Sequence, residues 1–139
     1  MTTQAYLSQA KRFDRMTMNK VQEIERYKEL LLSTTVAPKQ DVIQSSGNKD
    51  KLGTFMAKIV DLEKELDYVN MSREKIIKQI EGMSDPDVYQ VLYSKYISDC
   101  SLNEIARLIH ISKTHVYRLH DRALVEFEEK YGKYYLDIQ

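Results

Sequence analysis

The sequence is poor in the residues that turn or cross-link a chain. Its 139 residues include four Gly, two Pro and one Cys, and no Trp. Sandwiches, barrels and Gly-rich nucleotide-binding folds need more turn residues, so this scarcity predicts long regular segments. Cys100 alone cannot form a disulfide within the chain, and the Cys and His spacing typical of zinc sites is absent. We therefore expect helix packing to hold the fold together, without a metal or a cofactor.

An excess of charge and a long apolar run are also missing. Lys and Arg together number 21, and so do Asp and Glu. The longest apolar run is too short to cross a bilayer, and the first residues lack the apolar segment of a signal peptide. We expect a cytoplasmic protein with no membrane partner, in which any nucleic-acid site is confined to a local patch.

Apolar residues recur in steps of three and four in two segments that flank a connector, residues 33–49, which is rich in Ser and Thr and also contains Gly and Asn. The segment after the connector, with Arg73 as its break, repeats Leu52, Phe55, Ile59, Leu62, Leu66, Val69, Ile76 and Ile80. The segment before it repeats Tyr6, Ala10, Phe13, Val21, Ile24, Tyr27 and Leu31. Such a repeat keeps one seam facing a partner helix, so residues 1–83 are predicted to form a helical hairpin or coiled coil. The seams can pair within one chain or between chains.

A second domain is predicted over residues 84–139. Ser84 or Asp85 can cap a helix that has Pro86 in its first turn. Ser101 and Glu104 have the spacing of a capping box, and Ser112 can cap a further helix.

This spacing indicates a helix-turn-helix, in which a small residue is needed where the two helices cross. Ala106 has that place. The predicted core of the motif is Leu102, Ile105, Ala106, Ile109, Ile111, Val116 and Leu119. With this core buried, the opposite face presents Ser112, Lys113, Thr114, Tyr117, Arg118, Asp121 and Arg122.

The exposed face has the chemistry of a DNA major-groove reader. Arg118 is the candidate for base reading, because a guanidinium can bind guanine O6 and N7 together. Lys113, Thr114 and Arg122 are expected to hold phosphates, and Ser112 brings the amide-rich helix start close to the DNA backbone. Residues 101–125 carry four basic and two acidic side chains, a local excess in a neutral chain.

Histidine and tyrosine gather in the same region. His110 falls in the turn, where the backbone tends towards positive φ. His115 and His120 are expected near the DNA backbone, and a five-residue spacing puts successive His roughly 140° apart on a helix, which excludes a shared metal face. Tyr96 is expected to pack in the core.

The stretch DPDVYQVLYSKYISDCSLNEIARLIHISKTHVYRLHDRALVEFEE, residues 85–129, resembles region 4 of sigma-70-type factors. Over the full length, YLSQAKRFDRMTMNKVQEIERYKELL, KIVDLEKEL and RLHDRALVEFEE are similar to small phage and prophage proteins grouped with late-gene transcription regulators of the ArpU and RinA kind. The resemblance implies a phage-encoded DNA-binding regulator, with host RNA polymerase as a candidate partner. No region 2 is visible, so a complete sigma factor is not implied.

We therefore expect an all-α protein, with an N-terminal hairpin or coiled coil and a C-terminal helix-turn-helix domain. It would bind double-stranded DNA as a homo-oligomer, with a dimer favoured, in the cytoplasm of a bacterial host and on the nucleoid when bound. The alternatives are a DNA-packaging protein resembling small terminase subunits and a module that binds RNA polymerase. An enzyme is not expected, because no phosphate loop, activated nucleophile or apolar carboxylate pair is evident.

Overall fold

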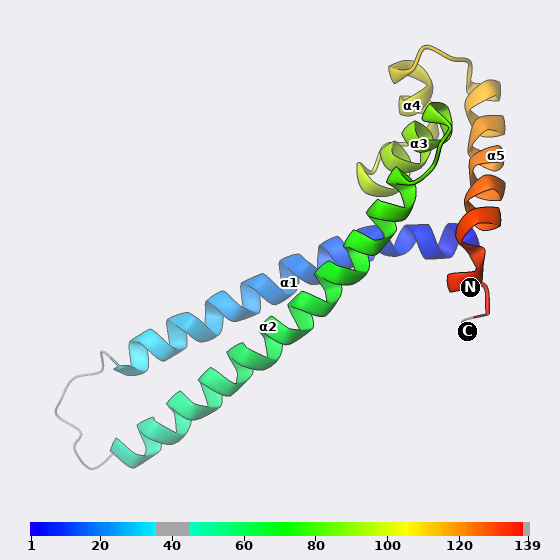
Figure 1. The fold of residues 1–139 in the computed structure, drawn as a ribbon. Coiled ribbons are helices and arrows are strands. Elements are labelled where there is room, and N and C mark those ends of the chain that lie inside the picture. Colours follow the sequence, from blue (N-terminus) through cyan, green and yellow to red (C-terminus); the bar gives the residue numbers. More distant parts are fainter. Residues whose placement is uncertain (36–44, 138–139) are drawn as a thin grey trace. The chain divides into compact units, whose positions relative to one another are not determined.

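The structure is a computed structural model that describes residues 1–35 and 45–137. Every regular element within these residues is a helix, which confirms the predicted all-α fold class. Its elements along the chain are α1 (Thr3–Thr35), α2 (Ser45–Glu81), α3 (Pro86–Leu92), the π-helical turn η2 (Tyr93–Ile97), α4 (Leu102–Leu108), α5 (Lys113–Tyr131) and the 3-10 turn η3 (Gly132–Tyr134) (Figure 1). The long helices extend into both ends of the predicted connector, and its residues 36–44 lie outside the described residues. No helix within the described part is both long and apolar enough for a membrane span.

The chain forms two compact units. One unit combines Met1–Asp14 with Ser72–Gln139, and the other comprises Arg15–Met71. The predicted boundary lies between residues 83 and 84. The observed division differs from it, because the start of α1 and the end of α2 belong with the C-terminal helices. We call the first the head and the second the hairpin.

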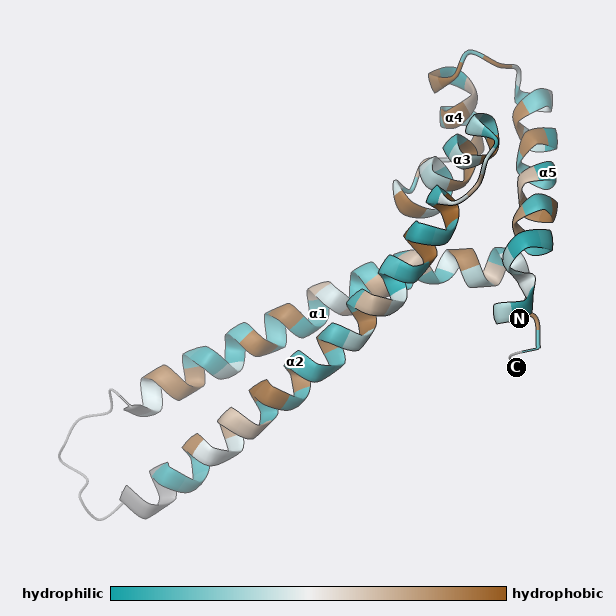
Figure 2. Ribbon diagram, viewed as in Figure 1, coloured by the Kyte–Doolittle hydropathy of each residue, from teal (hydrophilic) through white to brown (hydrophobic). Residues whose placement is uncertain are grey.

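In the hairpin, α1 and α2 pack against each other within one chain. Lys20 Nζ lies 2.7 Å from Glu65 Oε2, and the rings of Tyr27 and Phe55 have centroids 5.9 Å apart. The later residue of α1 thus contacts the earlier residue of α2, so the two helices are antiparallel. Figure 2 shows apolar residues recurring along both helices between hydrophilic ones.

The predicted seam of α2 is the least exposed side of that helix in the hairpin. Val69 is buried, and Leu52, Phe55, Ile59, Leu62 and Leu66 are half-buried. On α1 the assignment of Val21 to the seam is wrong, because its side chain is 41% exposed. The seam of α1 includes Lys20 and Ile24, which are less exposed, and Val21 lies on the outer side of the helix.

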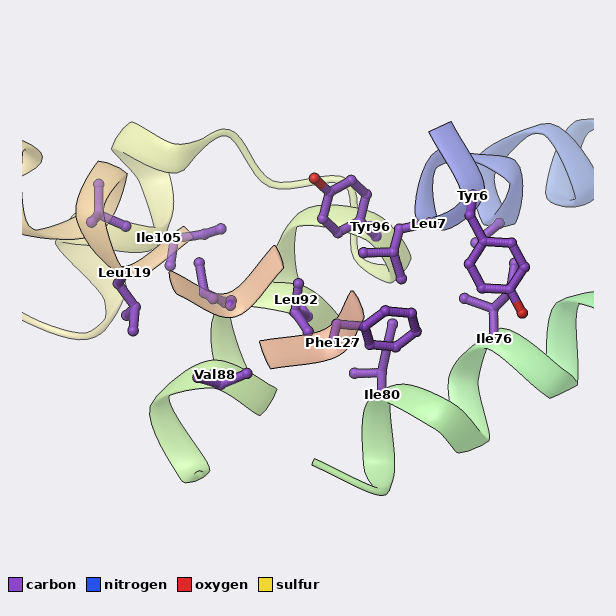
Figure 3. Packing of buried hydrophobic residues seen from close by; sticks show 14 of the residues in the cluster. Tyr6, Leu7, Ile76, Ile80, Val88, Leu92, Tyr96, Ile105, Leu119 and Phe127 are labelled. Atoms are coloured by element: carbon purple, nitrogen blue, oxygen red, sulfur yellow. The ribbon is translucent and has the colours of Figure 1, made fainter. Parts of the chain in front are cut away.

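The head is built around a single apolar cluster to which both ends of the chain contribute. Figure 3 shows Leu7 from α1, Ile76 and Ile80 from α2, and Phe127 from α5 within it. Leu7 is fully buried and was not part of the predicted stripe. The first turns of α1 are therefore part of the head's core.

Aromatic contacts bind the first turns of α1 to the end of the chain. The rings of Tyr6 and Tyr135 stack with centroids 4.3 Å apart. The Tyr6 hydroxyl donates to Gln79 Oε1 at 2.6 Å, and the hydroxyls of Thr3 and Tyr135 lie 2.7 Å apart. Burial raises the pKa of both tyrosines, so both stay protonated at neutral pH.

Arg73, the break in the apolar repeat of α2, has a structural partner. Its Nε forms an ion pair with Asp14 of α1, and Lys11 of α1 pairs with Asp99 at 2.5 Å. These pairs attach this part of α1 to α2 and to the turn that follows η2. A charge at this seam position is therefore compatible with the packing, although it interrupts the apolar pattern.

We expect Leu7→Ala to lower the free energy of unfolding of the head by about 2 to 5 kcal/mol, because it removes a fully buried side chain and leaves a cavity. Leu32→Ala is the matched control, since Leu32 is 65% exposed, and it should cost less than about 0.5 kcal/mol. Chemical denaturation followed by circular dichroism measures both. Equal, small effects would show that α1 does not contribute to the head's core.

Candidate nucleic-acid interface

The first helix of the motif, α4, begins with the predicted cap. The amide of Glu104 donates to Ser101 Oγ at 3.1 Å, and the Ser101 hydroxyl donates to Glu104 Oε1 at 3.2 Å. These bonds satisfy one amide that the helix start leaves without an intrahelical partner. The start of α4 is thus fixed by local chemistry that the sequence displays.

The turn after α4 depends on one residue in the left-handed region. His110 has φ 59°, as predicted for the turn. The next amide, of Ile111, donates to the Ala106 carbonyl at 2.9 Å. This pattern is that of a Schellman motif, in which the left-handed residue lets the chain reverse and cap the helix. His tolerates that conformation better than a β-branched residue does.

The second helix, α5, begins at its own cap. Ser112 is extended, with φ −70° and ψ 160°, and its hydroxyl oxygen accepts from the His115 amide at 3.1 Å. The amides of the first turn therefore point towards the same end of the helix as Lys113 and Thr114. A helix start of this kind favours a nearby anion such as a phosphate.

The predicted core residues of the motif all lie on its inner side. Ile105, Ala106, Val116 and Leu119 are buried, and the half-buried residues are Leu102, Ile109 and Ile111. Their packing joins α5 to α3 and α4. One face of α5 is thereby unavailable to any ligand.

The predicted contact residues all lie on the outer side of the motif. Those classed as exposed are Ser112, Lys113, Thr114, Tyr117, Arg118, Asp121 and Arg122. Tyr117 is 52% exposed, a large aromatic surface beside the charged groups. The structure therefore brings these residues together on the first three turns of one helix.

Arg122 differs from the other predicted phosphate ligands because it has carboxylate partners. Its Nη2 donates to Asp85 Oδ2 at 2.8 Å, and its Nε lies 3.8 Å from Glu126 Oε1. Asp85 also caps α3, since its Oδ1 accepts from the Asp87 amide at 2.8 Å. The guanidinium of Arg122 thus links α5 to α3, and these carboxylates partly neutralise the charge that it can offer to a phosphate.

The expectation that His120 lies on the surface, near the DNA backbone, is wrong. Its side chain is only 6% exposed, and its Nε2 lies 2.7 Å from the Tyr96 hydroxyl in the core. Burial lowers the pKa of His120, and the charge of Lys95 lowers it further, while Asp121 acts in the opposite direction. The inner stripe of α5 includes position 120 because it follows Val116 by four residues.

One exposed apolar residue of the motif is not among those predicted. Leu108, in the last turn of α4, is 64% exposed. The buried stripe of α4 leaves position 108 on the outer side, and that pattern was the available signal. An exposed apolar side chain at this place adds a surface that can contact a thymine methyl group or another protein.

The described residues contain no group of three or more His, Cys, Asp or Glu side chains arranged to hold a metal ion. No protein-family model matches this chain, and no curated protein or solved structure matches it either.

We expect the head to lose stability as the pH falls through about 6.5, because His120 takes up a proton more readily in the unfolded chain than in the core. His120→Gln keeps a polar side chain that does not titrate, so its stability should depend less on pH over this range. His115→Gln changes an exposed histidine and is the control. Thermal unfolding at a series of pH values measures the effect, and identical pH profiles for all three proteins would refute it.

Proposed function

We propose that this protein binds double-stranded DNA through the exposed face of α5, which enters the major groove. The observation that supports this most directly is the separation of the two faces of α5. Val116, Leu119 and His120 are buried against the head, while Lys113, Tyr117 and Arg118 are exposed on the opposite side. A second helix held in this way by a preceding helix and turn is the geometry of helix-turn-helix readers.

Each exposed residue has a role that its chemistry supports. Arg118, one turn beyond the helix start, reads a guanine through its two terminal nitrogens. Lys113 and Thr114 hold phosphates together with the first amides of α5. Ser112 contributes mainly through the cap that aims those amides, since its oxygen already accepts from His115. Tyr117 offers an apolar ring to the groove, and Asp121 limits which bases fit beside Arg118.

The charge available for phosphates is small. Arg122 is paired with Asp85, so the local positive excess that the sequence suggests is partly neutralised. Few phosphate contacts mean weak binding at physiological salt and a shallow dependence on salt concentration. Two linked heads on adjacent half-sites raise the affinity through effective concentration. We therefore propose a homodimer whose hairpins pair the two heads.

The biological role follows from the resemblances in the sequence. Likeness to region 4 of sigma-70-type factors and to ArpU and RinA regulators supports a phage-encoded transcriptional regulator, acting on DNA in the cytoplasm of a bacterial host. By the same likeness, host RNA polymerase is a candidate protein partner. A role in DNA packaging, of the small terminase kind, would require a ring of many subunits.

Selection of binding sites from random duplex DNA, with mass measurement of the bound species, tests this function. We expect one enriched sequence with two related half-sites and a complex that contains two protein chains. Failure to enrich any sequence would refute specific DNA reading. A ring-sized complex would favour packaging instead.

Arg118→Ala should weaken binding to the selected site about 10- to 100-fold and relax the preference at one base pair, because one bidentate contact is lost. Lys113→Ala should weaken binding to all sequences alike and reduce the salt slope by about one. Arg26→Ala, at an exposed arginine of the hairpin, is the control. Fluorescence anisotropy titrations at several salt concentrations measure these effects. Unchanged affinity in Arg118→Ala would exclude α5 as the reading helix.

A further inference from the structure

Arg122 projects from the outer side of α5 but has carboxylate partners from its own helix and from the start of α3. It follows Arg118 by four residues, so both exposed side chains lie on the same side of α5. Its Nη2 donates to Asp85 Oδ2 at 2.8 Å, and its Nε lies 3.8 Å from Glu126 Oε1. One edge of the guanidinium therefore faces two carboxylates, although the side chain is still 51% exposed.

The start of α3 holds Asp85 in place. Its Oδ1 accepts from the amide of Asp87 at 2.8 Å and from that of Val88 at 3.4 Å, while Oδ2 contacts Arg122. The helix α3 packs in turn against α5, and Val88 is fully buried. The carboxylate of Asp85 is thus a positioned negative charge beside Arg122, and its own helix cap limits how far it can move away.

The two carboxylates cancel the positive charge that the sequence shows in the motif. Residues 101–125 carry four basic and two acidic side chains, and neither Asp85 nor Glu126 belongs to that range. With both included, acidic and basic side chains are equal in number. Folding therefore removes the local positive excess, in part through a residue that lies outside the helix-turn-helix in the sequence.

We propose that Asp85 lowers the DNA affinity of the head, because its carboxylate competes with a DNA phosphate for Arg122. A single exposed ion pair is weak, so a phosphate can displace the carboxylate or share the guanidinium with it. In the first case the contact with Asp85 is lost, and in the second the carboxylate and the phosphate repel each other. This inference rests on the proposed binding of DNA by α5 and assigns a residue that regulates it.

The effect of Asp85 is expected to be the same for all DNA sequences. Phosphate contacts contribute to the binding of every sequence, whereas base preference comes from contacts in the groove. Asp85 therefore reduces affinity without changing the preference that Arg118 provides. A head weakened in this way stays on DNA mainly when a linked head is bound beside it.

Asp85→Asn tests the proposal on the full chain, because Asn removes the charge and caps helices about as well as Asp. We expect binding to tighten about 3- to 10-fold, both to the selected duplex and to an unrelated one, and the salt slope to increase by up to about one. Asp87→Asn is the matched control, since it removes an equal charge from an exposed position in the first turn of α3. It should change the affinity less than about twofold, because Asp87 is not an ion-pair partner of Arg122 in the described part of the chain.

Arg122→Gln tests whether Asp85 acts through Arg122. In the Arg122→Gln background, Asp85→Asn should change the affinity less than about twofold, because the competing pair no longer exists. Electrophoretic mobility shifts over a range of salt concentrations measure the affinities, and thermal unfolding checks that each variant folds. Asp85→Ser, which also keeps a capping oxygen without the charge, replaces Asp85→Asn if that variant is unstable.

Tighter binding of Asp85→Asn that disappears in the Arg122→Gln background supports the proposal. Unchanged or weaker binding of Asp85→Asn, an equal gain in Asp87→Asn, or a gain that persists without Arg122 overturns it. A wild-type chain that binds no duplex even at low salt would instead refute the proposed function itself. The two failures are therefore distinguishable by the binding of the wild-type chain.

Discussion

The packing of the first turns of α1 against the end of α5 is the contact on which the head depends. Tyr6 stacks on Tyr135, and the ring of Phe127 lies with its centroid 6.2 Å from that of Tyr6. Leu7 joins Phe127 in the same buried cluster. Because these residues fix the C-terminal half of α5 while Val116 fixes the other half, α5 is held along its whole inner side. A helix held in this way can present its outer face in one orientation.

One buried and one exposed polar residue of α5 maintain that orientation. His120 is buried and contacts the Tyr96 hydroxyl, so it ties α5 to the turn that follows α3. Arg122 is exposed and contacts Asp85, so it ties α5 to the start of α3. In the proposed complex, the groups left to meet DNA are therefore those of the first turns, near Lys113 and Arg118. Under this proposal, the head supplies position and sequence reading, and little of the electrostatic attraction to DNA.

Local chemistry made much of this predictable from the sequence. The caps at Ser101 and Ser112, the left-handed turn at His110 and the apolar repeat of α2 each depend on residues close together in the chain. The contacts that escaped prediction are long-range: Leu7 with the head's core, Arg73 with Asp14, and His120 with Tyr96. Periodicity shows that a helix has an apolar side, but it does not show which element covers that side. This is why residues 1–14 were assigned to the hairpin and His120 to the exposed surface.

Reading of DNA by the outer face of α5 is the central claim, and amide NMR of the isotope-labelled full chain tests it most directly. Duplex DNA is added at low salt, where even weak binding populates the complex. We predict that the largest shift changes fall on the amides of residues 112–118, with small changes along the hairpin. Changes concentrated on the hairpin, or on the buried side of α5 through unfolding of the head, would contradict the claim.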